Sequence, residues 1–168
     1  MGLVLLLLGG AAAAEEGTGG ARLGGSYAYV GGEGEIKKMY DAIDVVVGKM
    51  NVFIRGIARR RIRKPNMPPP VIELRIGQDN ITLARSGHSD MPAPRDGKPA
   101  PWRSHEGKFR VSYALDASEL VQKLVGQSSH VTKRFMLDPD GTTLRVQTRI
   151  ESSRLPGPIE FTLTYRRK

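Results

Sequence analysis

The sequence predicts an α+β protein that is mostly β, in which a long amphipathic helix precedes an antiparallel sheet curled into a barrel or half-barrel. Two patterns carry this prediction. Apolar residues recur at helical spacing over 35–63, and apolar and polar residues alternate, as in strands, over much of 71–167. The length of 168 residues suits one domain with a sizeable core. Because closing a long sheet removes its exposed edges, we expect about seven or eight strands around a common interior.

The composition is that of a folded, basic protein without cysteine. Hydrophobic residues make up 39% of the chain and charged residues 26%, which indicates a packed core rather than disorder. The formal net charge of +9 favours anionic partners such as phosphate or lipid head groups. The absence of cysteine excludes disulfides, thiolate metal sites and cysteine nucleophiles.

The N-terminal segment predicts export followed by a linker. Residues 1–14 are a short apolar run followed by small residues, which is the outline of a secretory signal peptide, although no Lys or Arg precedes the run. The run is too short to span a bilayer. Residues 15–34 are Gly-rich and predict a flexible linker. We therefore expect a secreted or periplasmic protein whose single helix-plus-barrel domain spans 35–168.

Residues 35–63 contain the strongest helical pattern in the chain. The apolar stripe consists of Ile36, Met39, Tyr40, Ile43, Val46, Val47, Met50, Phe53, Ile54 and Ile57. We expect a bend or break at Gly48 or Gly56, and Pro65 marks the expected end of the helix. Such a helix would either plug the mouth of the barrel or pack on the open face of the sheet.

The first predicted strands follow the stiff connector formed by Met67 and three prolines. Residues 71–76 and 81–85 alternate and predict a hairpin. Residues 87–101 are rich in proline and predict a long loop that could hide a short strand, and another short strand is expected around 99–104.

The clearest alternation lies in the C-terminal third. Strands are expected over 109–115, 120–125, 131–137, 144–151 and 159–167. The phase of the second of these is ambiguous, and Lys133 interrupts the apolar side of the third. The turn before residue 144 contains Pro139, which presets φ, and Gly141, which can take a positive φ.

Over 71–167 this meander, with aromatic residues on its predicted inner face, resembles small bacterial members of the lipocalin and fatty-acid-binding-protein class, the calycins. The resemblance implies an apolar ligand inside the barrel. Two motifs differ from the class: Trp102 does not follow the Gly-x-Trp pattern of lipocalins, and Tyr165 and Arg167 reverse the Arg-x-Tyr of fatty-acid-binding proteins. Cone-shaped barrels of the nuclear-transport-factor-2 class also begin with helices and end in strands, but they have a further helix that this sequence does not predict.

The predicted inner face supplies the candidate ligand site. The candidate ligand-binding residues are Phe109, Val111, Tyr113, Phe135, Phe161 and Tyr165. Because an eight-stranded barrel is only just wide enough to be filled by its own side chains, these residues would either line a pocket or fill the core.

The end of the predicted helix supplies a candidate anion site. The candidate anion-binding residues are Arg59, Arg60, Arg61, Arg63 and Lys64. They could hold an anionic lipid surface, or they could be solvated charges that complement the helix dipole. No aromatic residues are interleaved with them to stack on bases, which disfavours nucleic acid as a partner.

No catalytic, metal or cofactor motif stands out in the sequence. His88, His105 and His130 lack metal-ligand spacing, and Ser128 and Ser129 lie outside any Gly-x-Ser-x-Gly elbow. We expect a non-enzymatic protein without a cofactor. The leading hypothesis is a secreted binding protein for a small hydrophobic or amphipathic ligand. The alternative is an interaction module whose basic amphipathic helix binds a protein partner or an anionic membrane surface.

Overall fold

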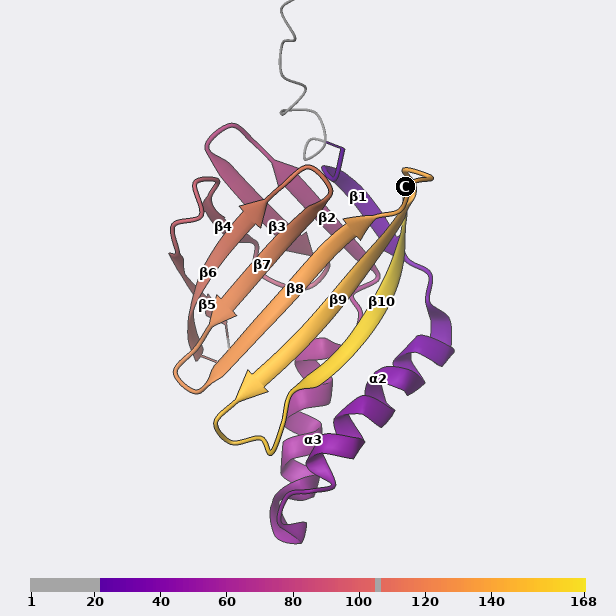
Figure 1. The fold of residues 1–168 in the computed structure, drawn as a ribbon, viewed down its shortest axis with the longest axis vertical. Coiled ribbons are helices and arrows are strands. Elements are labelled where there is room, and N and C mark those ends of the chain that lie inside the picture. The colour runs from indigo at the N-terminus through magenta and orange to yellow at the C-terminus, as the bar shows by residue number, and fades with distance from the viewer. Residues whose placement is uncertain (1–21, 105–106) are drawn as a thin grey trace, which may run out of the picture.

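A computed structural model describes residues 22–104 and 107–168, which form a ten-stranded antiparallel sheet around an apolar interior, with two helices at one end (Figure 1). The helices are α2 (Gly32–Val47) and α3 (Val52–Asn66). The strands are β1 (Gly25–Tyr29), β2 (Val71–Ile76), β3 (Asn80–Arg85), β4 (Met91–Pro94), β5 (Ala100–Ser104), β6 (Gly107–Leu115), β7 (Glu119–Val125), β8 (Ser129–Leu137), β9 (Thr143–Ser152) and β10 (Ile159–Arg167).

The sheet is a nearly closed barrel whose two edges are joined by side chains. The strand order is β4-β3-β2-β1-β10-β9-β8-β7-β6-β5, so β4 and β5 are the edge strands. Trp102 Nε1 of β5 donates a hydrogen bond to the Asp90 carbonyl oxygen just before β4, at 2.9 Å. Tyr113 Oη of β6 donates to the Met91 carbonyl oxygen of β4, at 2.7 Å. These side-chain hydrogen bonds connect the two edges of the sheet, which are not joined by continuous backbone pairing.

Strand β1 joins the beginning of the described chain to its end. It lies between β2 and β10, with Tyr27 opposite Ile72 on one side and opposite Arg167 on the other. The Arg167 guanidinium donates to the Gly24 carbonyl oxygen (2.8 Å) and to Tyr27 Oη (2.7 Å). Arg167 therefore fixes the pairing of β1 with β10, and its guanidinium is engaged by these groups.

The structure corrects the predicted number of strands, which is ten rather than seven or eight. The additional strands are β1 and β4. Strand β1 lies within 15–34, the segment that the sequence predicted to be a flexible linker. The glycines on either side of this strand interrupt the alternation by which a strand is recognised in a sequence. Strand β4 reads Met-Pro-Ala-Pro, and its prolines are tolerated because it is an edge strand. The predicted signal peptide, residues 1–14, lies outside the described residues.

The structure also replaces one long helix with two shorter ones. The break falls at Gly48, as expected, and not at Gly56, which lies inside α3. The Asn51 side chain caps α3 by accepting a hydrogen bond from Phe53 N at 3.0 Å. Pro65 does not end the helix at the preceding residue, because it falls in the last turn, where few backbone hydrogen bonds remain to be lost.

Helix α2 packs on β10 and carries the apolar residues that the helical pattern placed toward the core. Its buried residues are Met39, Ile43, Val46 and Val47. The Glu35 carboxylate ties the helix to the strand by accepting from Thr164 N (2.8 Å) and from Thr164 Oγ1 (2.6 Å). Helix α3 has no buried residue, and it lies across the open end of the barrel (Figure 1). Neither described helix is long and apolar enough to cross a membrane.

The alternation predicted for the last two strands is confirmed. Their buried inward residues are Leu144, Val146, Thr148, Ile150, Ile159, Phe161, Leu163 and Tyr165. The turn before β9 is also as expected at Gly141, which has a φ of +70°. Its main side-chain acceptor is Asp140, whose carboxylate accepts from Thr142 N and Thr143 N, both at 2.8 Å. These hydrogen bonds lower the pKa of Asp140 well below its usual value.

Candidate functional site

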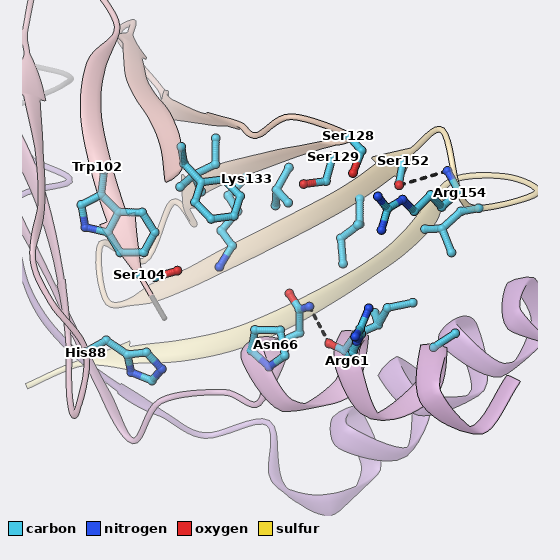
Figure 2. Close-up of a pocket in the computed structure, with 18 of the residues that line it drawn as sticks. Arg61, Asn66, His88, Trp102, Ser104, Ser128, Ser129, Lys133, Ser152 and Arg154 are labelled. Carbon is cyan, nitrogen blue, oxygen red and sulfur yellow. Dashed lines mark hydrogen bonds between the residues drawn. The ribbon is translucent and has the colours of Figure 1, made fainter. Parts of the chain in front are cut away.

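A cavity of about 900 Å³ lies between α3 and the inner face of the sheet (Figure 2). Small-molecule sites in proteins have volumes of roughly 300–1,000 Å³, so this cavity is large enough for a whole ligand. Strands β3 to β9, the loop after β3 and the loop after β9 supply its other walls. The barrel interior is therefore hollow at this end.

The walls of the cavity are largely apolar. From α3 and the segment that joins it to α2 come Met50, Ile54, Ile57, Ala58 and Ile62, and from the sheet side come Met91, Trp102, Phe109, Leu124, Val131, Ile150 and Leu155. The rings of Trp102 and Phe109 pack with their centroids 5.9 Å apart. Burying the apolar part of a ligand against such walls is favourable by about 25 cal/mol per Å² of apolar surface removed from water.

The polar lining of the cavity is basic. Arg61, Arg85, Lys133 and Arg154 all line it, and none of the described lining residues carries a carboxylate. A ligand with an anionic or strongly polar head group would therefore meet favourable charge inside, in surroundings where Coulomb interactions are stronger than in water.

Lys133 belongs to this lining and lies on the inner face of the sheet. It projects from the middle of β8 into the space above α3 (Figure 2), on the same face as Val131 and Phe135. Its neighbours across the sheet are Gln122 on β7 and Thr148 on β9, and both are buried. Burial, with a smaller contribution from the Arg85 charge, lowers the pKa of Lys133 to about 7.

In the sequence, Lys133 is visible only as an interruption of the apolar side of its strand. The ambiguous phase of 120–125 had a similar cause, because Gln122 also points inward. These two irregularities are cross-strand neighbours. Polar residues on the apolar face of two adjacent strands were thus the available signal for the site.

The structure places the predicted ligand-binding residues in two environments. Phe109 lines the large cavity, whereas Phe135, Phe161 and Tyr165 surround a second void of about 20 Å³, which is close to the volume needed for one water molecule. Val111 is fully buried in the wall of the barrel. Ligand contact by this set of residues stays a prediction.

The hydroxyl of Tyr113, the sixth of these residues, forms hydrogen bonds with other strands of the barrel. Besides donating to β4, Tyr113 Oη accepts from Leu83 N (3.2 Å) and from Gln122 Nε2 (3.0 Å). Burial raises the pKa of Tyr113 to about 12. The hydroxyl is therefore a neutral structural link between strands on opposite sides of the barrel gap.

The predicted anion-binding residues point in three directions. Arg59 and Arg63 bind the Asp44 carboxylate of α2 at 2.9 and 2.8 Å, and the Arg63 guanidinium lies 4.1 Å from the centre of the Tyr40 ring. Arg61 lines the cavity. Arg60 and Lys64 are exposed and do not line the cavity, so they are positioned for an external anionic surface.

Among the described residues, no catalytic arrangement forms from those noted in the sequence, and His105 lies outside the described part of the chain. Ser128 and Ser129 line the cavity, but the adjacent His130 lies on the exposed face of β8. His88 also lines the cavity, and its Nδ1 is 3.1 Å from the Ser86 carbonyl oxygen. Within residues 22–104 and 107–168, no group of three or more His, Cys, Asp or Glu residues could hold a metal ion.

Solved structures with this fold include proteins named for the lipids that they bind. A fatty-acid-binding protein from Drosophila melanogaster brain aligns with a TM-score of 0.52 and 16% identity, covering 84% of this chain and 95% of its own. A zebrafish ileal bile acid-binding protein complexed with cholic acid aligns with a TM-score of 0.51 and 12% identity, covering 88% and 99%. A heat-soluble (SAHS) protein from Ramazzottius varieornatus gives a TM-score of 0.56 and 10% identity, covering 91% and 99%.

These comparisons confirm the expected resemblance at the level of the fold, which is that of the fatty-acid-binding proteins. No family model matches the sequence, and no curated protein matches it.

Proposed function

We propose that this chain is a non-enzymatic binding protein that holds a small apolar or amphipathic molecule in the cavity beneath α3. The observation that carries the proposal is a space of about 900 Å³ with apolar walls and a basic lining. The shared fold supports it, since proteins named for fatty acids and bile acids have the same barrel. A cavity of this kind is the usual form of a small-molecule site.

The arrangement of the lining suggests how such a ligand would lie. Its apolar body would pack against Ile54 of α3 and against Leu124 and Ile150 of the sheet. Its polar head would lie near Lys133 and Arg85, deep in the cavity, where a carboxylate would be the best complement. The ligand class proposed is therefore an apolar molecule with one polar or anionic end.

Fluorescence titration with the neutral apolar probe N-phenyl-1-naphthylamine tests this function. Trp102 is the only tryptophan of the chain and lines the cavity, so a bound probe should quench its emission by energy transfer. Oleate should then displace the probe. Failure of both the probe and oleate to bind would overturn the proposal.

A matched pair of variants locates the binding. Leu124 lines the cavity, whereas the next residue, Val125, is 39% exposed on the outer face of the barrel. Leu124→Trp should fill part of the cavity and weaken probe binding at least about tenfold, equivalent to about 1.4 kcal/mol. Val125→Trp adds the same side chain outside and should leave the affinity unchanged. Equal effects of the two substitutions would place the ligand elsewhere.

The outer face of α3 supports a second candidate function, contact with an anionic lipid surface. Phe53, Ile57, Arg60 and Lys64 recur at helical spacing and are all exposed, with Phe53 at 87%, and Ile57 also borders the cavity. Apolar residues at one end of such a stripe and basic residues at the other suit the interface of an anionic bilayer. This is the part of the predicted interaction helix that the sheet leaves uncovered.

Sedimentation with liposomes tests the second candidate. The chain should bind vesicles containing phosphatidylserine and not vesicles of phosphatidylcholine alone, and Phe53→Ser or Arg60→Glu should reduce the bound fraction. Lys38→Glu changes an exposed charge on α2 and serves as the control. Undiminished binding of both α3 variants would remove this candidate.

We also propose that the chain is exported, since residues 1–14 have the outline of a signal peptide. Expression in a bacterial host with N-terminal sequencing of the extracytoplasmic product should show cleavage after Ala14. Retention of the uncleaved chain in the cytoplasm would contradict this.

A further inference from the structure

Lys133 differs from the other cationic side chains of the cavity in having a compact primary amine. Among the described residues, no hydrogen bond or ion pair reaches this amine. Gln122 and Thr148, its cross-strand neighbours, are uncharged, and the nearest inward residues along its own strand are Val131 and Phe135. The amine therefore faces the open space of the cavity without a counter-ion among the described lining residues.

We propose that Lys133 Nζ captures apolar aldehydes as a reversible covalent imine inside the cavity. This inference rests on the proposed ligand-binding function and goes beyond it, because the bond would select ligands by a reactive carbonyl and not by apolar surface alone. The aldehyde carbon would lie next to β8, and its hydrocarbon tail would extend toward α3 along the apolar walls (Figure 2).

The surroundings of Lys133 favour the neutral, nucleophilic form of the amine. The charged and titratable groups that line the same cavity are Arg85 from β3, Arg61 from α3, His88 from the loop after β3 and Arg154 from the loop after β9. Burial disfavours the charged amine, the Arg85 cation adds a smaller effect in the same direction, and none of the described lining residues is an acid that would favour protonation. The pKa of about 7 reflects this, so roughly half of the amine is neutral near pH 7.

The reaction needs no oxidant and no group that the cavity lacks. The Nζ lone pair attacks the aldehyde carbon, the carbonyl π electrons move to oxygen, and a proton passes from nitrogen to that oxygen to give a carbinolamine. Loss of the hydroxyl as water, with a proton taken from solvent and the last N–H proton returned to it, leaves the C=N bond. Burial of the site limits the water available for the reverse reaction, which favours the bound imine.

Trapping with borohydride tests the inference. The folded chain is incubated with decanal near neutral pH, reduced with sodium borohydride, and analysed by intact and peptide mass spectrometry. Reduction converts the imine to a secondary amine, so the mass should rise by that of decanal less one oxygen atom. Modification of Lys133 should be at least about tenfold faster than that of exposed lysines, because an ordinary lysine is almost entirely protonated at this pH.

Two substitutions and one control complete the design. Lys133→Met and Lys133→Arg should both abolish the fast modification, and the second keeps a positive charge in the cavity. Lys123→Met removes an exposed lysine from the neighbouring strand and should leave the fast modification intact. Circular dichroism checks that each variant is folded. Persistence of the fast adduct in either Lys133 variant would overturn the inference.

The same sample distinguishes failure of this inference from failure of the proposed function. If wild-type protein binds N-phenyl-1-naphthylamine but gives no preferential adduct at Lys133, the covalent step is wrong and the binding function stands. If the neutral probe does not bind either, the binding function fails as well.

Discussion

The two ends of the barrel are built from the same strands but are packed in opposite ways. At the closed end, Tyr27, Phe135, Leu144 and Tyr165 are at most 2% exposed and leave no space for a ligand. At the open end, the inner face carries the residues that line the cavity of about 900 Å³, and α3 lies over them. Strand β8 passes from one end to the other, from Val131 in the cavity through Lys133 to Phe135 in the packed core.

This difference shows how one sheet can supply both stability and a binding site. The aromatic side chains of Tyr27, Phe135 and Tyr165 are buried in the closed end, whereas the side chains at the open end, including Trp102 and Phe109, line the walls and leave the space between them unfilled. Lys133 lies at the boundary and lines both the large cavity and the small void beside the core. Substitutions at the two ends should therefore have distinct consequences. Three sets of substitutions test whether the two ends differ in this way.

The largest expected effect comes from truncating the closed end. Leu144→Ala creates a new void in a packed region and should lower the free energy of unfolding by about 3 kcal/mol. Leu124→Ala makes the same change at the open end, where a cavity already exists, and should cost only about 1 kcal/mol. Urea denaturation monitored by circular dichroism measures both. Similar losses at the two positions would show that the ends are equally packed.

A smaller change in the free energy of unfolding, and one that depends on pH, is expected on substitution of Lys133, which lies between the two ends. The folded-state pKa of Lys133 is about 7, below that of a lysine in an unfolded chain, so folding is penalised by the buried charge. Lys133→Met should raise the free energy of unfolding at neutral pH by about 2 kcal/mol, a figure reduced from the full pKa shift because the amine faces an open cavity.

The sign of this pH dependence follows from the two pKa values. Below about pH 7 the amine is charged in both states and the penalty is complete; above the unfolded-state pKa of about 10.4 it is neutral in both and the penalty is gone. The difference between Lys133→Met and wild type should therefore shrink as the pH rises through this window. Urea denaturation at several pH values measures it, and a constant difference would contradict the buried-amine assignment.

The smallest expected effect concerns the attachment of α3 to the open end. Asp44→Asn removes the carboxylate that holds Arg59 and Arg63, which should lower the free energy of unfolding by at most about 1 kcal/mol because the pairs are partly exposed. Amide hydrogen exchange should accelerate in α3 and not in the strands of the closed end. Asp41→Asn, which breaks an exposed pair with Lys37 within α2, is the control and should leave exchange in α3 unchanged.

Much of the barrel was predictable because strand alternation is a local property. The buried faces of 144–151 and 159–167 follow directly from period-two patterning, and the helical stripe correctly placed Met39 and Ile43 in the core. Strand β1 was missed because a five-residue segment flanked by glycines has little pattern of its own, and its order comes from pairing with β2 and β10. Tertiary contact, not local sequence, decides such a strand.

The candidate site was less predictable because it depends on which side chains meet across strands. The aromatic residues chosen from the sequence are mostly those that fill the closed end, since alternation does not indicate which inward positions lie opposite a void. Lys133 and Gln122 become a cross-strand pair only once the register of β7 and β8 is known. In the sequence, Lys133 and Gln122 were therefore visible only as interruptions of an otherwise regular alternation.

The position of β1 has a consequence for how the chain folds. Tyr27 must find Arg167, 140 residues away, before the first and last strands can pair. Contacts between such distant residues raise the contact order, and barrels dominated by them fold in milliseconds to seconds. During synthesis, α2 would emerge from the ribosome well before β10, the strand on which its apolar face rests, so this face would be exposed until translation reaches the C-terminal strand. Helix α2 is thus the segment on which a chaperone would act first.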